Sequence, residues 1–206
     1  VAAAALLPLG VARAQAVAPH GDAIYTPAPG QTGKDVMWLG TPDAMVAAML
    51  KAARTGPADF VADLGAGDGR IAIAAARDFG ARALGIEYDP KMAALAARNA
   101  ARAGVGDRVR IVEGDIFKED FARASVVTLY LLPELNLQLR PTILAMTPGT
   151  RVVSYQFTMA EWEPHQLIRG PTWDAYLWIV PATVAGRWRV ADESGRDVAT
   201  VELAQQ

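Results

Sequence analysis

Acidic side chains and glycines gather at three points along the chain where a run of apolar residues ends. The first run carries Asp63 and leads into a glycine-rich segment at 65–69. Glu87 follows the second run, and Asp115 follows the third. Glycines let a backbone turn sharply and approach a ligand closely, and carboxylates accept hydrogen bonds from ammonium, hydroxyl or amino groups. The pattern therefore predicts a ligand site built from three successive segments.

The elements that must position these residues alternate regularly. The predicted strands are apolar throughout and are bounded by turn residues. Segments with helical periodicity separate them. This pattern is typical of a parallel sheet that is covered by helices on both faces. In such a sheet, ligands bind beyond the carboxyl ends of the strands. The predicted strands are 60–64, 83–86, 109–112, 125–131 and 150–157, and the helices between them are 69–79, 90–103 and 133–146.

Another helix is predicted before the first strand. Thr41 is expected to cap it, with Pro42 at its first position, and Met45 and Met49 follow at helical spacing. Gly56 is expected to end it.

The end of the chain has a different pattern. Three strand-like runs, at 176–180, 186–190 and 198–203, are joined by short connections that require antiparallel pairing. We therefore expect an α/β domain, mostly parallel, with an antiparallel hairpin at its C-terminal end.

The glycine spacing distinguishes between two classes of nucleotide ligand. A nicotinamide dinucleotide favours G-x-G-x-x-G, whereas this loop reads G-x-G-x-G with Arg70 in the sixth place. Asp63, two residues before the first glycine, would repel a pyrophosphate but suits the ammonium group of an amino acid. An adenosine joined to an amino acid through a sulfonium fits this set of acids, and that molecule is S-adenosylmethionine.

These motifs resemble those of class I S-adenosylmethionine-dependent methyltransferases over roughly residues 41–203. The resemblance implies a Rossmann-like seven-stranded sheet, and S-adenosylhomocysteine as product. It also implies that Asp63 and the glycine loop take the methionine part, Glu87 the ribose and Asp115 the adenine. The cofactor residues predicted in this way are Asp63, Gly65, Ala66, Gly67, Gly69, Glu87, Tyr88, Asp115, Ile116 and Thr41.

A narrower resemblance concerns the segment 63–71 and the Thr-Pro before the first helix. Both are similar to small methyltransferases related to the ATP synthase c-subunit lysine methyltransferase, which implies a protein lysine as methyl acceptor. In that group a Tyr-Val-Pro-Thr segment helps to close the cofactor site. The present chain matches it at Thr41, has Trp38 as the aromatic residue, and has Gly40 in place of the proline.

The acceptor is expected to meet the cofactor at the end of the fourth strand. Adenine and glutamine methyltransferases place Asn/Asp-Pro-Pro-Tyr/Phe there, but this chain reads Leu-Leu-Pro-Glu at 131–134 and lacks the leading amide. Alternatively, Glu134 stabilises the first turn of the helix that follows, because its negative charge interacts favourably with the positive end of the helix dipole. The sequence designates no catalytic residue, and the substrate-side candidates are Trp38, Tyr130, Leu131, Glu134 and Asn136.

Composition excludes several other classes. The 206 residues are 52% hydrophobic and 20% charged, with a net charge of −2 and no cysteine, which excludes a disordered chain, a disulfide scaffold and a Cys-ligated zinc site. Neither a dedicated nucleic-acid surface nor a transmembrane helix is expected. No cluster of histidines and carboxylates suggests a metal, so none is predicted.

Residues 1–16 are apolar and end in two Ala-x-Ala sequences, which favours either a signal-like segment or a disordered tail. A lead-in arm or lid is expected at 17–40, and the methyltransferase domain at 41–206. Because S-adenosylmethionine is made and consumed in the cytoplasm, the expected cofactor favours a cytoplasmic location, whereas residues 1–16 suggest export.

Beside protein-lysine methylation, two functions stay open: a small-molecule methyltransferase, and a nucleotide-binding module without turnover.

Overall fold

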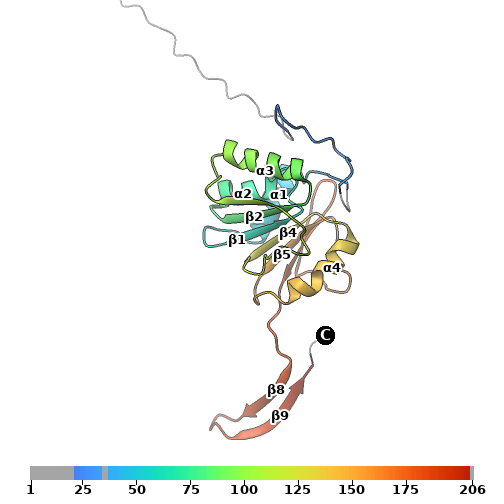
Figure 1. The fold of residues 1–206 in the computed structure, drawn as a ribbon. Coiled ribbons are helices and arrows are strands. Elements are labelled where there is room, and N and C mark those ends of the chain that lie inside the picture. Colours follow the sequence, from blue (N-terminus) through green and yellow to red (C-terminus); the bar gives the residue numbers. More distant parts are fainter. Residues whose placement is uncertain (1–20, 34–36, 205–206) are drawn as a thin grey trace, which may run out of the picture.

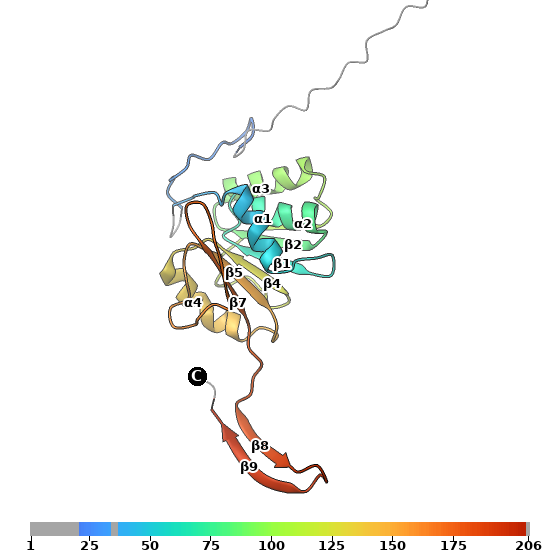
Figure 2. The ribbon, with the colours of Figure 1, turned by 180° about the vertical axis from the view of Figure 1, so that it is seen from behind.

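A computed structural model describes residues 21–33 and 37–204, so the signal-like segment at 1–16 and the start of the lead-in arm lie outside the described residues. The chain forms a seven-stranded sheet with helices on both faces, and a separate two-stranded hairpin (Figures 1 and 2). Its elements are α1 (Asp43–Ala52), β1 (Phe60–Leu64), α2 (Arg70–Phe79), β2 (Arg82–Glu87), α3 (Pro90–Arg102), β3 (Val109–Glu113), β4 (Val126–Leu129), α4 (Pro133–Leu144), β5 (Arg151–Tyr155), β6 (Gln166–Ile168), β7 (Ala175–Ile179), β8 (Gly186–Ala191) and β9 (Asp197–Leu203).

The strand order places the carboxyl ends of β1 and β4 next to each other. The order is β3-β2-β1-β4-β5-β7-β6, and all pairs from β3 to β5 are parallel. Because the chain runs outward from β1 in one direction and from β4 in the other, strand order reverses between them. Ligands bind in the crevice at such a switch point. The predicted α/β sheet is confirmed.

Two hydrophobic cores hold the sheet. One lies under α1, α2 and α3 and includes Met49, Leu50 and Ile71, and the other lies under α4 and includes Leu139 and Ile143. The parallel strands are buried on both sides, which is why the sequence shows continuous apolar runs there instead of alternation.

Residue types at the helix ends explain where α3 begins and where α2 ends. The side chain of Asp89 accepts hydrogen bonds from the backbone N–H groups of Lys91 and Met92 at the start of α3, and Gly80 ends α2 in the left-handed region. The predicted cap of α1 is wrong. Pro42 holds the N-cap position without a side-chain hydrogen bond, and Thr41 is buried one residue earlier.

The C-terminal strands differ from the prediction in two respects, and the first concerns the edge of the main sheet. Two antiparallel strands complete the main sheet, but they are β7, which pairs with β5, and β6, which pairs with β7. β6 has only three residues, too few to show a period, and the sequence pattern does not predict it.

The predicted terminal hairpin forms, but as a sheet of its own that projects from the body (Figures 1 and 2). One face of this hairpin is apolar. Trp188 lies opposite Val201 and Val190 lies opposite Ala199, and the Trp188 side of the ribbon is exposed to solvent. The hairpin therefore contributes nothing to the two cores of the sheet.

Candidate cofactor and acceptor site

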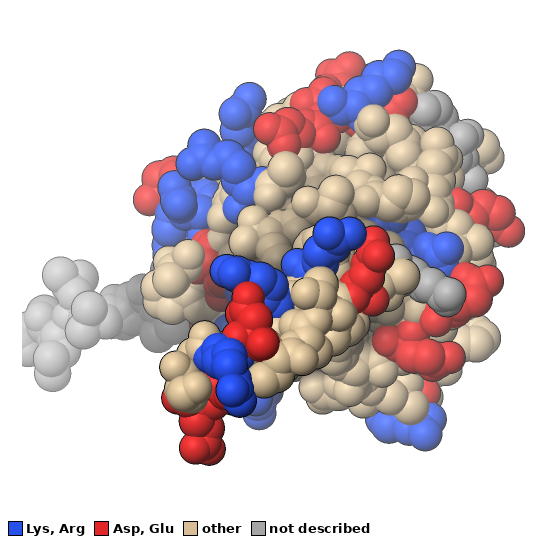
Figure 3. Space-filling model, turned by 90° about the horizontal axis from the view of Figure 1, so that it is seen from below, with Lys and Arg blue, Asp and Glu red and all other residues tan. Residues whose placement is uncertain are grey.

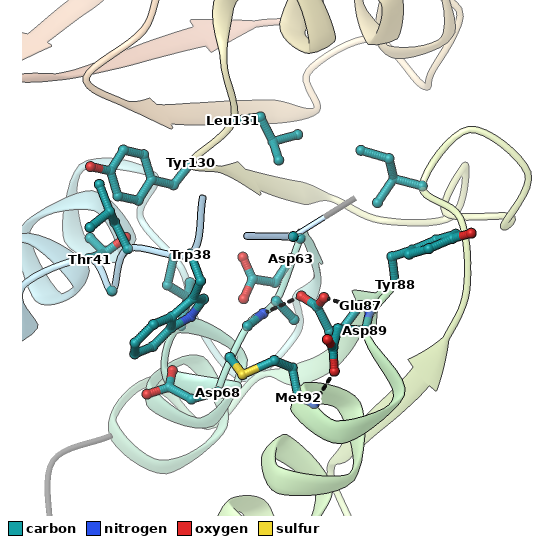
Figure 4. A pocket seen from close by; sticks show the side chains of 18 of the residues that line it. Trp38, Thr41, Asp63, Asp68, Glu87, Tyr88, Asp89, Met92, Tyr130 and Leu131 are labelled. Atoms are coloured by element: carbon teal, nitrogen blue, oxygen red, sulfur yellow. Dashed lines mark hydrogen bonds between the residues drawn. The ribbon is translucent and has the colours of Figure 1, made fainter. Parts of the chain in front are cut away.

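A pocket opens at the carboxyl ends of the parallel strands, at the switch point between β1 and β4. Residues from the lead-in arm, from the loops after β1, β2 and β3, and from the end of β4 line it (Figure 4). Among the described residues that line it, Arg70 is basic, and five are acidic, namely Asp63, Asp68, Glu87, Asp89 and Asp115. Arg70 forms an ion pair with Asp68 at 2.7 Å, so the pocket favours a cationic ligand.

Asp63 lies at the centre of this pocket. Its carboxylate is only 2% exposed, and its Oδ1 accepts a hydrogen bond of 2.8 Å from the Thr128 hydroxyl of the adjacent strand β4. Oδ2 makes no hydrogen bond in the described part of the chain. Burial raises the pKa of Asp63 to about 7, and the nearby charges of Asp68 and Glu87 also act to raise it. A buried, unpaired oxygen of this kind needs a donor, and an ammonium group supplies one.

The loop after β1 depends on glycine where other parts of the chain approach it. Gly67 has φ +58, and a Cβ there would lie 2.7 Å from Nε1 of Trp38. At Gly69, with φ +83, a Cβ would lie 3.0 Å from the Cβ of Ala96 on α3. Both positions thus combine a left-handed backbone with a close contact, which only glycine meets without strain.

Glu87 braces the same loop from the end of β2. Its Oε2 accepts the Gly67 N–H at 2.7 Å and its Oε1 accepts the Asp89 N–H at 2.9 Å (Figure 4). Burial raises the pKa of Glu87. Each oxygen keeps a further lone pair, and together they can accept the two hydroxyls of a ribose.

The third acid, Asp115, lies in the loop after β3. Its Oδ1 accepts the Phe117 N–H at 3.0 Å, and Lys118 lies 3.9 Å from its Oδ2. Ile116 and Tyr88 line the pocket beside it, and Tyr88 is 52% exposed. An apolar side chain, an aromatic ring and a carboxylate can receive a flat base with an exocyclic amino group.

The lead-in arm closes one side of the pocket and is tied down at two places. Asp22 forms ion pairs with Arg98 and Arg102 of α3, at 2.6 and 2.9 Å. Further along, the Arg70 guanidinium donates to the backbone oxygen of Thr41 at 2.9 Å. Trp38, between these ties, lies against the glycine loop and lines the pocket (Figure 4).

The structure brings only some of the substrate-side candidates to the pocket. Trp38, Tyr130 and Leu131 line it, whereas Glu134 and Asn136 do not. Glu134 is exposed in the first turn of α4. Asn136 is fully buried, and its amide nitrogen donates to the Ser154 hydroxyl and to the backbone oxygens of Phe157 and Thr158, so that it holds the loop after β5.

Three residues that shape the site were not predicted from the sequence. Thr128 holds Asp63, Gln156 holds the Tyr130 hydroxyl, and Met92 lines the pocket as well. Thr128 gave no signal because its type and position are those of any strand residue. Met92 did carry one, since it lies three residues after Asp89, in the first turn of the helix that follows the acidic segment 87–89.

A metal site is not formed by the residues that the structure describes, which contain no group of three His, Cys, Asp or Glu side chains able to hold an ion. Among the same residues, no helix is long and apolar enough to cross a membrane.

Comparison with known proteins agrees with this geometry. Residues 63–166 match the model of the ANTKMT methyltransferase domain. A protein-lysine N-methyltransferase of Saccharolobus islandicus is 40% identical over 136 residues, which are 65% of this chain and 84% of that protein. The mouse lysine N-methyltransferase of the ATP synthase c-subunit is 36% identical over 112 residues, and the match spans 54% of this chain and 44% of the mouse protein. The predicted resemblance to this group is confirmed.

A solved structure is also similar. The RNA methyltransferase from Salinibacter ruber, crystallised in complex with S-adenosyl-L-homocysteine, is 44% identical, with a TM-score of 0.69 over 71% of this chain and 96% of its own. The similarity therefore extends over nearly all of that protein.

Proposed function

Because the chain belongs to the ANTKMT methyltransferase domain family and is an S-adenosylmethionine-dependent methyltransferase, we propose that its methyl acceptor is the side-chain amine of a protein lysine. The placement of the cofactor in this pocket is supported above all by Asp63, which is buried at the switch point between β1 and β4 and has one carboxylate oxygen without a hydrogen-bond partner among the described residues. The methionine ammonium would be its donor.

The remaining parts of the cofactor follow from that anchor. Glu87 would accept the ribose hydroxyls, and Asp115 with Ile116 would take the amino group and the face of the adenine. The sulfonium end would then point toward the end of β4, where Tyr130 and Leu131 line the pocket. When bound, the cofactor supplies an electrophilic methyl group with a good leaving group, so this chain's own contribution is positioning and the exclusion of water.

Two observations favour a lysine over a nucleic-acid base as acceptor. The described residues that line the pocket include five acids and one ion-paired arginine, a set that attracts a cationic side chain and disfavours a phosphate backbone. The segment after β4 also lacks the amide that presents a base or glutamine nitrogen to the methyl donor. Seen from below, acidic and basic side chains are interspersed over the surface (Figure 3). The lysine methyltransferase relatives point the same way.

The test is to incubate the enzyme with methyl-labelled S-adenosylmethionine and a cell lysate, and to follow the label after protease or ribonuclease treatment. We expect protease to release the label, and complete acid hydrolysis to yield methylated lysine. Label released by ribonuclease would instead support an RNA acceptor, as in the name of the Salinibacter protein, and label in the small-molecule fraction would support the small-molecule alternative.

A further inference from the structure

Tyr130 holds a defined position on the acceptor side of the pocket. It follows β4 directly, it is half-buried, and its hydroxyl donates a hydrogen bond of 3.0 Å to Oε1 of Gln156. Gln156 follows β5, the neighbouring strand. The pair therefore joins the carboxyl ends of two parallel strands beside the place where the methyl group would lie.

The backbone at Gln156 is unusual for its residue type. Its φ of +71° lies in the left-handed region, which non-glycine residues seldom adopt, and its N–H donates to the Asp174 backbone oxygen at 2.8 Å. A glycine would meet this backbone at lower cost, so a glutamine here indicates that its side chain is needed. That side chain's amide oxygen accepts the hydrogen bond of the Tyr130 hydroxyl.

Aromatic neighbours fix the ring itself. The Tyr130 ring contacts Tyr155 edge-on, with 4.8 Å between ring centroids, and stacks on Phe157 at 6.4 Å. The backbone of Phe157 is in turn held by Asn136. Burial raises the pKa of Tyr130, so the phenol stays protonated at neutral pH. With its proton directed to Gln156, the phenol oxygen offers its remaining lone pairs as acceptors.

We propose that the Tyr130 hydroxyl, oriented by Gln156, accepts a hydrogen bond from the amine of the acceptor lysine and aims the nitrogen lone pair at the methyl carbon. This inference rests on the proposed function. The lysine ammonium first gives up a proton to water, which leaves a neutral amine with a lone pair. Its nitrogen then forms the new N–C bond as the S–C bond breaks and the S–C electron pair returns to sulfur, and the product is a methylammonium. Tyr130 is thus a substrate-contacting residue, and Gln156 is a positioning residue.

The first test replaces Tyr130 by phenylalanine, which keeps the ring and its packing and removes only the hydroxyl. We expect Tyr130→Phe to lower kcat at least tenfold on a lysine-containing acceptor protein. Affinity for S-adenosylhomocysteine, measured by calorimetry, should change less than twofold. A kcat within twofold of the wild type would overturn the proposal, and so would a loss confined to cofactor affinity.

The second test concerns Gln156. Gln156→Gly preserves the left-handed backbone and removes the amide, and we expect a three- to tenfold loss of kcat in the wild-type background but none in the Tyr130→Phe background. If the loss of kcat in the double variant equals the product of the losses in the two single variants, Gln156 acts independently of Tyr130, which would contradict the positioning role. If the wild-type enzyme labels no lysine at all, the proposed function fails; if it labels lysine and Tyr130→Phe is unimpaired, only this inference fails.

Discussion

At the scale of single residues, Asp63 is the most informative side chain. The sequence placed it at the end of a strand, and the apolar run 60–64 already implied burial. What the sequence could not supply is the hydroxyl of Thr128, which takes one carboxylate oxygen and leaves the other without a partner. That asymmetry depends on β4 lying beside β1, a pairing between residues 65 positions apart. An acid kept unpaired in this way destabilises the unliganded fold and favours binding of a cation.

Replacing Asp63 by asparagine should therefore separate stability from binding. Asparagine still accepts the Thr128 hydrogen bond but cannot ionise. At pH 8 the ionised wild-type carboxylate destabilises the fold, so Asp63→Asn should raise the free energy of unfolding by about 1–3 kcal/mol. Its affinity for S-adenosylhomocysteine should fall at least about a hundredfold, because a charge-assisted hydrogen bond is lost.

Urea unfolding and calorimetry measure the two effects. Asp107→Asn, which changes a largely exposed carboxylate, is the matched control and should alter neither quantity. An Asp63→Asn variant that binds as tightly as the wild type would exclude Asp63 as the anchor of the ammonium group.

The pH dependence follows from the same group. The raised pKa of Asp63, about 7, means that the folded protein binds a proton there that the unfolded chain releases. The contribution of Asp63 to the stability of the unliganded enzyme is thus fully present at low pH, and this contribution is lost as the pH rises through about 7. Binding has the opposite sign, because only the carboxylate accepts the ammonium. Affinity for S-adenosylhomocysteine should fall about tenfold for each pH unit below 7, and Asp63→Asn should abolish this slope in a calorimetric series from pH 8 to pH 6.

At the scale of elements, the alternation of strands and helices was predictable because apolar runs and helical periods are local properties. The predictions were wrong where tertiary contacts determine where an element begins or whether it forms. Thr41 has the residue type of a cap, but its backbone oxygen is held by Arg70, and the helix begins after Pro42. β6 is too short to show a period, and it exists because β7 offers it an edge.

The packing of α2 against α3 gives a prediction at this scale. Gly69→Ala introduces a Cβ at φ +83 and 3.0 Å from the Cβ of Ala96, whereas Gly149→Ala introduces one at φ +89 with nothing within 4 Å. Backbone strain of about 1–2 kcal/mol is common to both. Because the new Cβ at residue 69 also overpacks the contact with α3, we expect Gly69→Ala to destabilise the fold by about 1–3 kcal/mol more than Gly149→Ala does. Thermal unfolding of the two variants measures the difference, and equal losses would show that the helices separate freely.

At the scale of the whole molecule, the body and the terminal hairpin are distinct. The sequence predicted the strands at 186–190 and 198–203 but not that they would leave the sheet, because nothing local distinguishes a strand that pairs with the body from one that pairs only with its neighbour. The 49% exposure of Trp188 reflects this separation.

A variant that ends at Pro181 tests the independence of the body. Val180 still exchanges backbone hydrogen bonds with Gly149 and Thr150, so the sheet keeps its last contacts. We expect affinity for S-adenosylhomocysteine to stay within twofold of the wild type and the unfolding temperature to shift by only a few degrees. A variant that fails to bind, although circular dichroism shows it folded, would mean that the hairpin contributes to the site.

A crystal structure of the enzyme with S-adenosylhomocysteine bound would decide the placement of the cofactor. We expect the ligand's amino group within hydrogen-bond distance of Asp63 Oδ2, its ribose hydroxyls on Glu87, and its adenine beside Ile116 with the amino group at Asp115. The sulfur should then face Tyr130. A ligand that leaves Asp63 Oδ2 unpaired, or whose sulfur points away from the end of β4, would show that the cofactor is anchored elsewhere.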